Sequence, residues 1–531
     1  IKVEWEEKGV LGEADPKIAI RKMSASELAK RRAALFEAWP GMQAAWLDEL
    51  CEQEGMQAFL NAGQNYPLLR GVQTNLYKCF LPQAWMLSNA RGVSGFLHPE
   101  GIYDDPKGGT FRAQVYPRLR DHFQFINETK LFPEVHNQTL FSVNTYGPFS
   151  ENPKFKHISN LFLPQTIDAS FSHDGQGVIP GIKKELESPE GDIKVKWNFD
   201  GHRDRIVEVG AHELAIFAKL YDDVGTPRLQ ARLPALHARQ LISVLEKFAA
   251  QPRRLGDLKG EYFSTVMFDE TYAQRDGTIR RETRFPDDAE QLVLSGPHFF
   301  VGNPFYNTPR AVCSSNKAYD NLDLTTLPDN YLPRTNYIPA CSPATYSQRT
   351  PKVPWLEIGK KSAQQVTEYY RFVSREMLSQ SGERTLIGAA LPPGPANVHT
   401  CIQQVFRKMP DLLCFLAGAV SLPVDYQVKS TGAGHANKSV IAKFPLVAFL
   451  HPLAVAAFAR TLGLTSLSSH YSDLWQSSFQ PDFRTQRWSV DPDDPNSPPW
   501  TACLRGDKDF FANLTPAWQR NCALRTDYSR R

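Results

Sequence analysis

The 531-residue chain lacks most of the short patterns that identify a metal, redox or nucleotide site. Its eight cysteines are scattered, and no two have the Cys-x-x-Cys spacing of zinc ribbons and redox motifs. Reduced thiols are therefore expected. His212-Glu213 is not a zincin motif, because position 216 is Ile. No glycine-rich loop ends in Gly-Lys-Ser or Gly-Lys-Thr, which excludes a P-loop.

Long apolar runs and a strong charge of one sign are also missing. No apolar stretch approaches about 18 residues, so no membrane span is expected, and the first residues do not resemble a signal peptide. The net charge of +3 is too small to predict nucleic-acid binding by itself. The 42 % apolar and 22 % charged residues are typical of globular proteins, and the length allows about two to four domains. A cytoplasmic location is expected.

Local patterns predict alternating helices and strands in the early part of the chain, which indicates an open α/β sheet. Ser24 or Ser26 is a plausible N-cap for the first helical stretch. The predicted helices cover 25–70, 74–90, 111–122, 207–222, 234–250, 361–380 and 446–464, and the predicted strands cover 93–98, 123–127, 141–146 and 384–391.

Four segments between residues 75 and 146 follow one another in a recognisable order. They are Asn75-Leu-Tyr-x-x-Phe-Leu-x-x-Ala, Gly95-Phe-Leu-x-Pro99, Arg118-Leu-Arg-Asp-His-Phe-Gln-Phe and Phe141-Ser-Val-Asn-Thr-Tyr146. This order resembles the second half of the catalytic domain of a γ-type adenine-N6 DNA methyltransferase. The wider resemblance is to Eco57I-like methylases of restriction-modification and DISARM-type phage-defence systems. It is most specific at 97–109 and 383–393.

The resemblance implies an α/β fold, namely the second half of a Rossmann-like methyltransferase sheet followed by a mixed α+β target-recognition region. It implies four parts along the chain. They are the distal half of the catalytic domain at 1–150, a linker and helical connector at 151–255, a DNA target-recognition domain at 256–480 and a C-terminal segment at 481–531.

The same resemblance implies a wall of the pocket that receives a flipped-out adenine. In the family, an aromatic residue at the end of the late strands stacks on that base, and Tyr146 is the candidate here. Stacking is worth about 1–3 kcal/mol per base, so an aromatic ring is physically suited to this position. Tyr77, Phe80 and Pro99 are the other expected members of the base pocket.

The family pattern also contains two motifs that this chain lacks, a glycine-rich cofactor loop and an Asn-Pro-Pro-aromatic tetrapeptide. In the resembled proteins a sequence like Ile1-Lys-Val-Glu-Trp5 directly follows the tetrapeptide, so we expect the chain to begin just after it. Asn303-Pro-Phe-Tyr306 is only a partial echo. No catalytic residue is therefore assigned within this chain. S-adenosylmethionine is expected to be bound mainly by residues outside it, and the chain alone is expected to be inactive.

Two basic segments, at 371–385 and 429–438, are candidates for contact with duplex DNA, through phosphates or guanine edges. An arginine paired with Glu376 or Glu383 is the structural alternative for the first segment, and a solvated turn around Thr431-Gly-Ala-Gly434 is the alternative for the second. The candidates are Arg371, Arg375, Arg384 and Thr385 in the first segment and Lys429, His435, Asn437 and Lys438 in the second.

His98 and Glu100, close to Asp104 and Asp105, invite a metal or acid–base interpretation. No ligand spacing recurs elsewhere, so a loop near the cofactor or substrate face is the favoured interpretation, and no metal site is assigned.

Taken together, the resemblance implies that the intact protein transfers a methyl group from S-adenosylmethionine to the N6 amine of adenine in duplex DNA, after base flipping. Its expected partners are duplex DNA, the N-terminal half of the methylase and other subunits of a defence system. The alternative is a non-catalytic DNA-binding specificity or assembly subunit of such a system. A nuclease partner is a third possibility, but no nuclease site is found.

Overall fold

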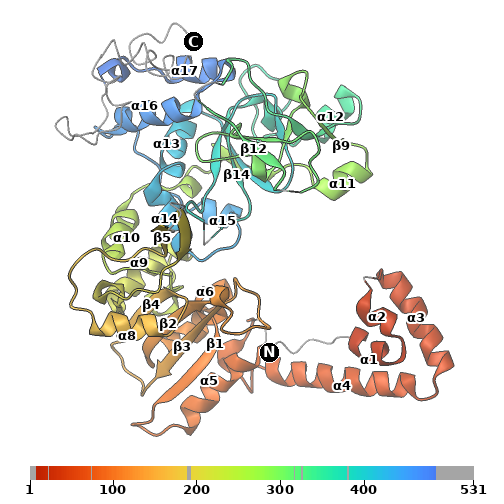
Figure 1. Cartoon of the computed structure of the whole chain (residues 1–531), viewed down its shortest axis with the longest axis vertical. Helices are drawn as coiled ribbons and strands as arrows, with labels where there is room; N and C mark the ends of the chain where they lie inside the picture. The colour runs from red at the N-terminus through yellow and green to blue at the C-terminus, as the bar shows by residue number, and fades with distance from the viewer. Residues whose placement is uncertain are drawn as a thin grey trace. The chain divides into compact units, whose positions relative to one another are not determined.

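A computed structural model describes residues 7–21, 23–72, 75–187, 193–315, 317–324, 327–379 and 382–485. The chain divides into two compact units, residues 1–246 and 247–531, whose elements are labelled in Figure 1. Of the predicted C-terminal segment, only 481–485 is described. Its tryptophans at 488, 500 and 518 lie outside the described residues.

Unit 1 opens with four helices, of which the third and fourth account for most of the helix predicted over 25–70, whereas the first two lie before that range. The side chain of Ser24 accepts a hydrogen bond from the backbone N–H of Glu27 and caps the third helix, as its sequence position predicts. Gly41, in the left-handed region with φ +88°, separates the third helix from the fourth. The four helices are α1 (Glu7–Ala14), α2 (Pro16–Ile20), α3 (Ala25–Ala38) and α4 (Met42–Asn61).

A five-stranded mixed sheet forms the centre of unit 1, in the order β1-β3-β2-β4-β7. β1 and β2 each pair antiparallel with β3, so they run parallel to one another, and β2 is also parallel to β4. The predicted α/β fold class is thereby confirmed. The sheet continues beyond residue 150, so unit 1 extends past the boundary predicted there. The strands are β1 (Ser94–Pro99), β2 (Leu119–Ile126), β3 (Leu140–Tyr146), β4 (Phe155–Leu161) and β7 (Val207–Val209).

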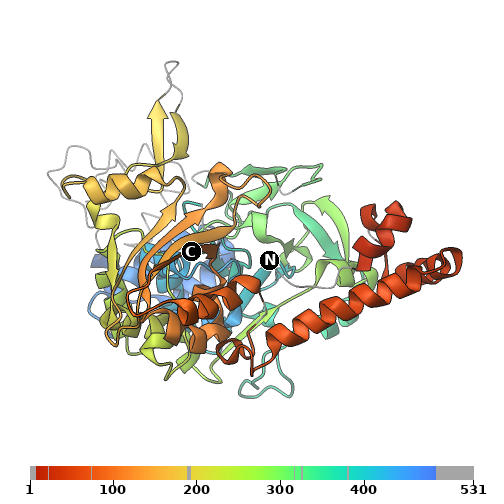
Figure 2. The ribbon, with the colours of Figure 1, turned by 90° about the horizontal axis from the view of Figure 1, so that it is seen from below.

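Helices lie on both faces of this sheet (Figure 2). On one face, Tyr77 of α5 (Leu76–Leu87) stacks on His98 of β1. α6 (Gly101–Asp104) and α7 (Gly109–Val115) follow β1 and lie on the same face as α5. On the other face, Phe171 of α8 (Gln165–Ser172) packs edge-on against Phe123 of β2.

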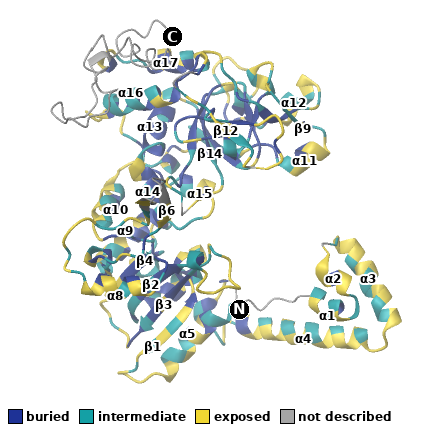
Figure 3. Cartoon of the chain, in the orientation of Figure 1, coloured by how far each residue is buried: buried dark blue, intermediate teal, exposed yellow. Residues whose placement is uncertain are grey.

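Two predictions in this region are wrong in detail. The helix expected over 111–122 ends with α7 at Val115, and β2 begins at Leu119. The strand predicted over 93–98 is β1, which lies at the edge of the sheet with three of its six residues exposed, so it is not the buried strand that its apolar residues favour (Figure 3). The remaining elements that begin in unit 1 are β5 (Lys183–Glu187), β6 (Ile193–Trp197), α9 (Ala211–Tyr221) and α10 (Leu241–Ala250).

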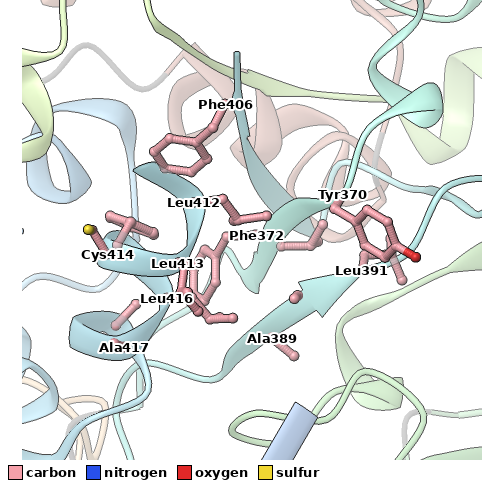
Figure 4. Packing of buried hydrophobic residues seen from close by; sticks show 14 of the residues in the cluster. Tyr370, Phe372, Ala389, Leu391, Phe406, Leu412, Leu413, Cys414, Leu416 and Ala417 are labelled. Carbon is pink, nitrogen blue, oxygen red and sulfur yellow. The ribbon is translucent and has the colours of Figure 1, made fainter. Parts of the chain in front are cut away.

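Unit 2 is built around a four-stranded antiparallel sheet in the order β15-β14-β17-β8. Phe372 of β14 and Phe406 of β17 pack against Phe415 of α13. Figure 4 shows both strand residues beside Leu412 and Leu413 of the same helix. The helix predicted over 361–380 is absent from the described part of that range, which holds a short 3-10 turn and β14. The elements around this core are β8 (Tyr262–Val266), β14 (Arg371–Arg375), β15 (Gly388–Leu391), β17 (Cys401–Phe406), α13 (Met409–Ala419), α14 (Leu422–Ser430), α15 (Lys438–Ile441), α16 (Ala454–Thr465) and α17 (Ser472–Ser478).

Smaller strand pairs and helices complete unit 2. They are β9 (Ile279–Arg284) with β13 (Thr335–Pro339), β10 (Val293–Leu294) with β16 (Ala396–Asn397), β11 (Asn307–Pro309) with β12 (Tyr319–Asn321), and helices α11 (Glu270–Arg275) and α12 (Pro343–Arg349).

Among the described residues, no single helix is long and apolar enough to cross a membrane. Only α13 and α14 together, bent by 70°, reach that length and composition. The six cysteines that lie within the described ranges are all free thiols.

Candidate functional site

One face of the unit 1 sheet carries polar side chains, although helices bury it. Side chains of paired residues point to the same face, and the register places His98 beside Ser142 and Ser142 beside Gln124. It likewise aligns Asn144 with His122 and His122 with His157. With three neighbours, these residues form what we call the polar layer, all of them buried: His98, Glu100, Tyr103, His122, Gln124, Ser142, Asn144, Tyr146 and His157.

A chain of hydrogen bonds joins a carboxylate to two imidazoles within the polar layer. Glu100 Oε1 lies 3.2 Å from His122 Nε2, and His122 Nδ1 lies 2.8 Å from His157 Nδ1. A carboxylate only accepts, so His122 Nε2 carries a proton and donates to Glu100, and one of the two Nδ1 atoms donates to the other. The amide of Gln124 donates to the second oxygen of Glu100 at 2.9 Å.

The surroundings of Glu100 and His157 determine the charge that each carries near neutral pH. Burial alone would raise the pKa of Glu100, but the charge and hydrogen bond of His122, with hydrogen bonds from Ser142 and Gln124, lower it to about 2. Burial, reinforced by neighbouring His122, lowers the pKa of His157 to about 3. Glu100 is therefore an anion and His157 is neutral at pH 7. The hydrogen bonds to Glu100 and His157 hold the ring of His122 in one orientation.

Tyr146 belongs to a second branch of the polar layer. Its hydroxyl lies 3.0 Å from His98 Nε2 and 3.2 Å from the hydroxyl of Tyr103, and burial raises the pKa of both tyrosines. Its ring is 1 % exposed and lies edge-on to Trp85 and Phe96. This burial contradicts the prediction that Tyr146 is an open stacking surface for a base.

The other predicted pocket residues separate into two groups. Tyr77 stacks on His98 with ring centroids 5.1 Å apart, and the carbonyl of Pro99 lies 2.9 Å from His98 Nδ1. His98 thus brings together Tyr77, Pro99 and Tyr146. Phe80 is exposed on α5, and no contact of its ring with His98 is found in the described part of the chain.

An exposed aromatic side chain does lie at the carboxyl ends of β1 and β2. The connection between β2 and β3 carries Phe132, which is 37 % exposed. Phe132 packs edge-on against Phe141, which pairs with Pro99 at the end of β1. In open α/β sheets, ligands bind beyond the carboxyl ends of the strands. Phe132 is not among the predicted base-pocket residues, although an aromatic residue in a polar, proline-containing turn was a usable signal.

The acidic residues at the same end of β1 do not form a metal site. Lys78 is buried and its ammonium lies 3.5 Å from Asp105. Within the described ranges, no group of three or more His, Cys, Asp or Glu side chains is placed to hold a metal ion.

In unit 2, Arg371 cannot contact DNA, which contradicts its predicted role. Its side chain is 0 % exposed, and burial lowers its pKa to about 9. Nε donates to Gln403 Oε1 at 2.8 Å, and the guanidinium also donates to three backbone carbonyls. These belong to Tyr369 (3.3 Å), Pro392 (3.4 Å) and Pro395.

The three other candidates of that segment also have partners within the protein. Arg375 donates to the carbonyls of Gly296 and Phe299, and Arg384 donates to the carbonyl of Val420. The side chain of Thr385 is buried. Asp425 lies 3.4 Å from Arg384 and accepts from the backbone N–H of Thr385, so the arginines are structural, with partners other than Glu376 and Glu383.

The second candidate segment remains on the surface. Lys429 donates to the carbonyl of Gly382 at 2.9 Å, whereas His435, Asn437 and Lys438 are exposed. His435 lies 2.9 Å from Glu376, and Asn437 caps α15. We call residues 434–438 the 434–438 turn. Its backbone pairs with 376–378 through Leu378 N–H to the Gly434 carbonyl and Ala436 N–H to the Glu376 carbonyl, which fixes its position.

The chain matches no protein-family model and no curated protein. Several solved structures match, among them the type IIG restriction endonuclease BpuSI. The alignment has 12 % identity, covers 91 % of this chain and 52 % of that chain, and has a TM-score of 0.26. The chain thus spans about half the length of that protein. A TM-score this low assigns neither a fold nor an activity to this chain.

Proposed function

We propose that this chain is the distal part of an S-adenosylmethionine-dependent DNA adenine-N6 methyltransferase of a restriction-modification or anti-phage defence system. It supplies one wall of the base pocket and the recognition of DNA sequence, whereas the methyl donor is bound mainly outside it. Base flipping brings the adenine amine to such a pocket.

The observation that carries the proposal is the order of elements between residues 76 and 146. A helix with the Leu-Tyr-x-x-Phe pattern, α5, precedes the strand β1, which ends at Pro99. Helix α7, strand β2 and strand β3 follow in the order expected from the resemblance. The carboxyl ends of β1 and β2 lie at the same edge of the sheet, where a ligand is expected.

Within this proposal, Phe132 replaces Tyr146 as the residue that stacks on the extruded base. The ring of Phe132 is partly open to solvent and lies at the carboxyl ends of β1 and β2, where it packs edge-on against Phe141. Tyr146 contributes to the base pocket indirectly. Its hydroxyl is hydrogen-bonded to His98, and Tyr77 is stacked on His98.

DNA contacts are assigned to the 434–438 turn rather than to the buried arginines. Lys438 is exposed at the start of α15, and His435 and Asn437 are exposed beside it. Such side chains can contact phosphates or base edges.

The proposal is tested by methyl transfer from labelled S-adenosylmethionine to duplex DNA. The chain is assayed alone and with a separately expressed polypeptide that carries the glycine-rich loop and the Asn-Pro-Pro-aromatic tetrapeptide. We expect N6-methyladenine only from the combination. Transfer by the chain alone would contradict the division of labour, and DNA binding without transfer in any combination would favour the alternative of a specificity or assembly subunit.

In the active combination, Phe132→Ala should lower kcat by about tenfold or more, because a stacked base loses about 1–3 kcal/mol, with little change in the Kd for duplex DNA. Phe149→Ala is the matched control. Phe149 is an exposed phenylalanine that follows the opposite end of β3. Equal effects of the two substitutions would refute the stacking role.

A further inference from the structure

One loop of unit 2 carries an aliphatic side chain that is almost completely exposed. It comprises residues 355–361, with the sequence Trp-Leu-Glu-Ile-Gly-Lys-Lys, and we call it the Ile358 loop. Ile358 is 99 % exposed and Leu356 is 50 % exposed. Single apolar side chains are common on protein surfaces, so this exposure alone does not indicate a binding site. The way the loop is held and charged is more informative.

The two ends of the Ile358 loop are fixed to one another and to the core. The backbone N–H of Val353 donates to the carbonyl of Gln364 at 3.0 Å, and the N–H of Val366 donates to the carbonyl of Pro351 at 2.9 Å. Trp355 is 7 % exposed and belongs to the same buried cluster as Val353 and Val366. The loop therefore stands on a packed base.

The apex of the Ile358 loop is a tight turn. The carbonyl of Glu357 accepts a hydrogen bond from the backbone N–H of Lys360 at 3.0 Å, and Gly359 has a φ of +81°. Positive φ at the third residue is the mark of a type II turn, in which glycine is favoured at that position. Ile358 is the second residue of this turn, so the backbone holds its side chain at the apex and away from the core.

The charges around the apex are predominantly positive. The carboxylate of Glu357 accepts hydrogen bonds from the indole of Trp355 at 2.9 Å and from the hydroxyl of Tyr369 at 3.0 Å, which directs it toward the base of the loop. Lys360 and Lys361 are exposed directly after the apex. Within the ranges that the structure describes, neither lysine forms an ion pair. The loop thus presents an aliphatic apex with two unneutralised ammonium groups beside it.

This combination matches the way in which some proteins deform duplex DNA. They insert Ile, Leu or another apolar side chain between base steps from the minor groove, while basic side chains bind the flanking phosphates. An anionic membrane surface attracts lysines as well, but membrane-binding segments usually add Trp or Phe. The Ile358 loop exposes no aromatic ring, because Trp355 is buried. Duplex DNA is therefore the partner that the loop fits better.

We propose that the Ile358 loop is a DNA wedge. Ile358 inserts between neighbouring base pairs in the minor groove, and Lys360 and Lys361 bind phosphates next to the opened step. The inference rests on the proposed function and adds to it a second DNA contact in unit 2, one that bends the duplex. A side chain inserted in this way kinks DNA by about 20–90°.

The first test measures DNA bending by the full chain. Energy transfer is recorded between dyes at the two ends of a mixed-sequence duplex of about 30 base pairs. The wild-type chain should shorten the end-to-end distance, and Ile358→Ala should abolish this change and weaken binding by about tenfold, because the apolar contact is lost. Ile358→Leu should retain the bend. Leu450→Ala, at a residue of unit 2 that is 92 % exposed, is the matched control and should bind and bend DNA like the wild type.

The second test measures phosphate contacts through the salt dependence of binding to the same duplex. The double substitution Lys360→Ala and Lys361→Ala should reduce the salt slope by about 2, because each phosphate contact contributes about 0.9. All these side chains are exposed, so the variants should keep the wild-type melting temperature.

Three results would overturn the wedge. If the wild-type chain binds the duplex and Ile358→Ala bends it equally, the wedge fails while the proposed function stands. If Ile358→Ala instead abolishes binding to phosphatidylserine vesicles and leaves DNA binding unchanged, the loop is a membrane contact. If the wild-type chain does not bind duplex DNA at all, the proposed function fails together with the wedge.

Discussion

The substitution Arg371→Ala distinguishes a structural arginine from a DNA contact. The guanidinium is fully buried at the start of β14. Its hydrogen-bond acceptors are the side chain of Gln403 and the carbonyls of Tyr369, Pro392 and Pro395.

The expected loss of stability follows from these contacts. Each buried acceptor left without a donor costs about 1–3 kcal/mol, and removal of a large core side chain adds about 2–5 kcal/mol for the cavity. Burial lowers the pKa of Arg371 to about 9, so the buried charge is itself unfavourable, and its removal offsets part of that loss. We therefore expect unit 2 to lose at least about 3 kcal/mol of unfolding free energy.

Urea unfolding followed by circular dichroism measures this loss, and DNA binding at several salt concentrations measures any phosphate contact. Lys438→Ala is the matched control, because Lys438 is exposed. It should change stability by less than about 0.5 kcal/mol and reduce the salt slope of DNA binding by about 1. A stable Arg371→Ala chain with weakened DNA binding and a smaller salt slope would refute the structural role.

Two further predictions concern the packing of each unit. Burial lowers the pKa of His98 to about 4 and that of His157 to about 3, whereas both protonate near 6.5 in the unfolded chain. The unfolded state therefore binds more protons as the pH falls below 6.5, and at pH 5 unit 1 should lose about 2 kcal/mol per histidine. Hydrogen exchange of β2 and β4 at pH 7 and pH 5 measures this, and equal protection free energies would contradict it. In unit 2, Gly388→Ala would place Cβ 2.5 Å from Phe372 Cζ and should cost about 1–3 kcal/mol of urea-unfolding stability. Gly434→Ala meets nothing within 4 Å, and a similar cost there would show that packing is not the cause.

Elements with strong local signals were predictable from the sequence. The helix predicted at 74–90 is α5 (Leu76–Leu87), and the strand predicted at 141–146 is β3 (Leu140–Tyr146). The helical spacing of apolar residues, and the alternation of apolar and polar residues in a strand bounded by turns, are encoded within a few neighbouring positions. No knowledge of distant contacts is needed to recognise them.

β14 was missed because a strand buried on both faces has no alternating pattern. Its short sequence, Arg371–Arg375, is compatible with a buried helix as well as with a strand. The role of Arg371 then depends on Gln403, which is 32 positions away, and on carbonyls beyond residue 390. Pairings over such distances are set by the tertiary fold and leave no local trace.

The polar layer was missed for a different reason. His122 and Gln124 alternate with Phe123 and Phe125, a pattern that normally indicates a solvated polar face and a buried apolar face. In unit 1 helices α5, α6 and α7 cover the polar face. The same alternation at Ser142 and Asn144 was a signal that several polar faces would meet.

The polar layer also determines which strand alignments the sheet tolerates. Successive side chains of a strand point to opposite faces, so a shift of β2 by one residue would exchange its phenylalanines with His122 and Gln124. Glu100 would then face aromatic rings and keep a buried charge without donors, at a cost of several kcal/mol. The hydrogen bonds that link Glu100, His122 and His157 thus specify one register of β2 with its neighbouring strands, and sheets with a shifted strand are disfavoured.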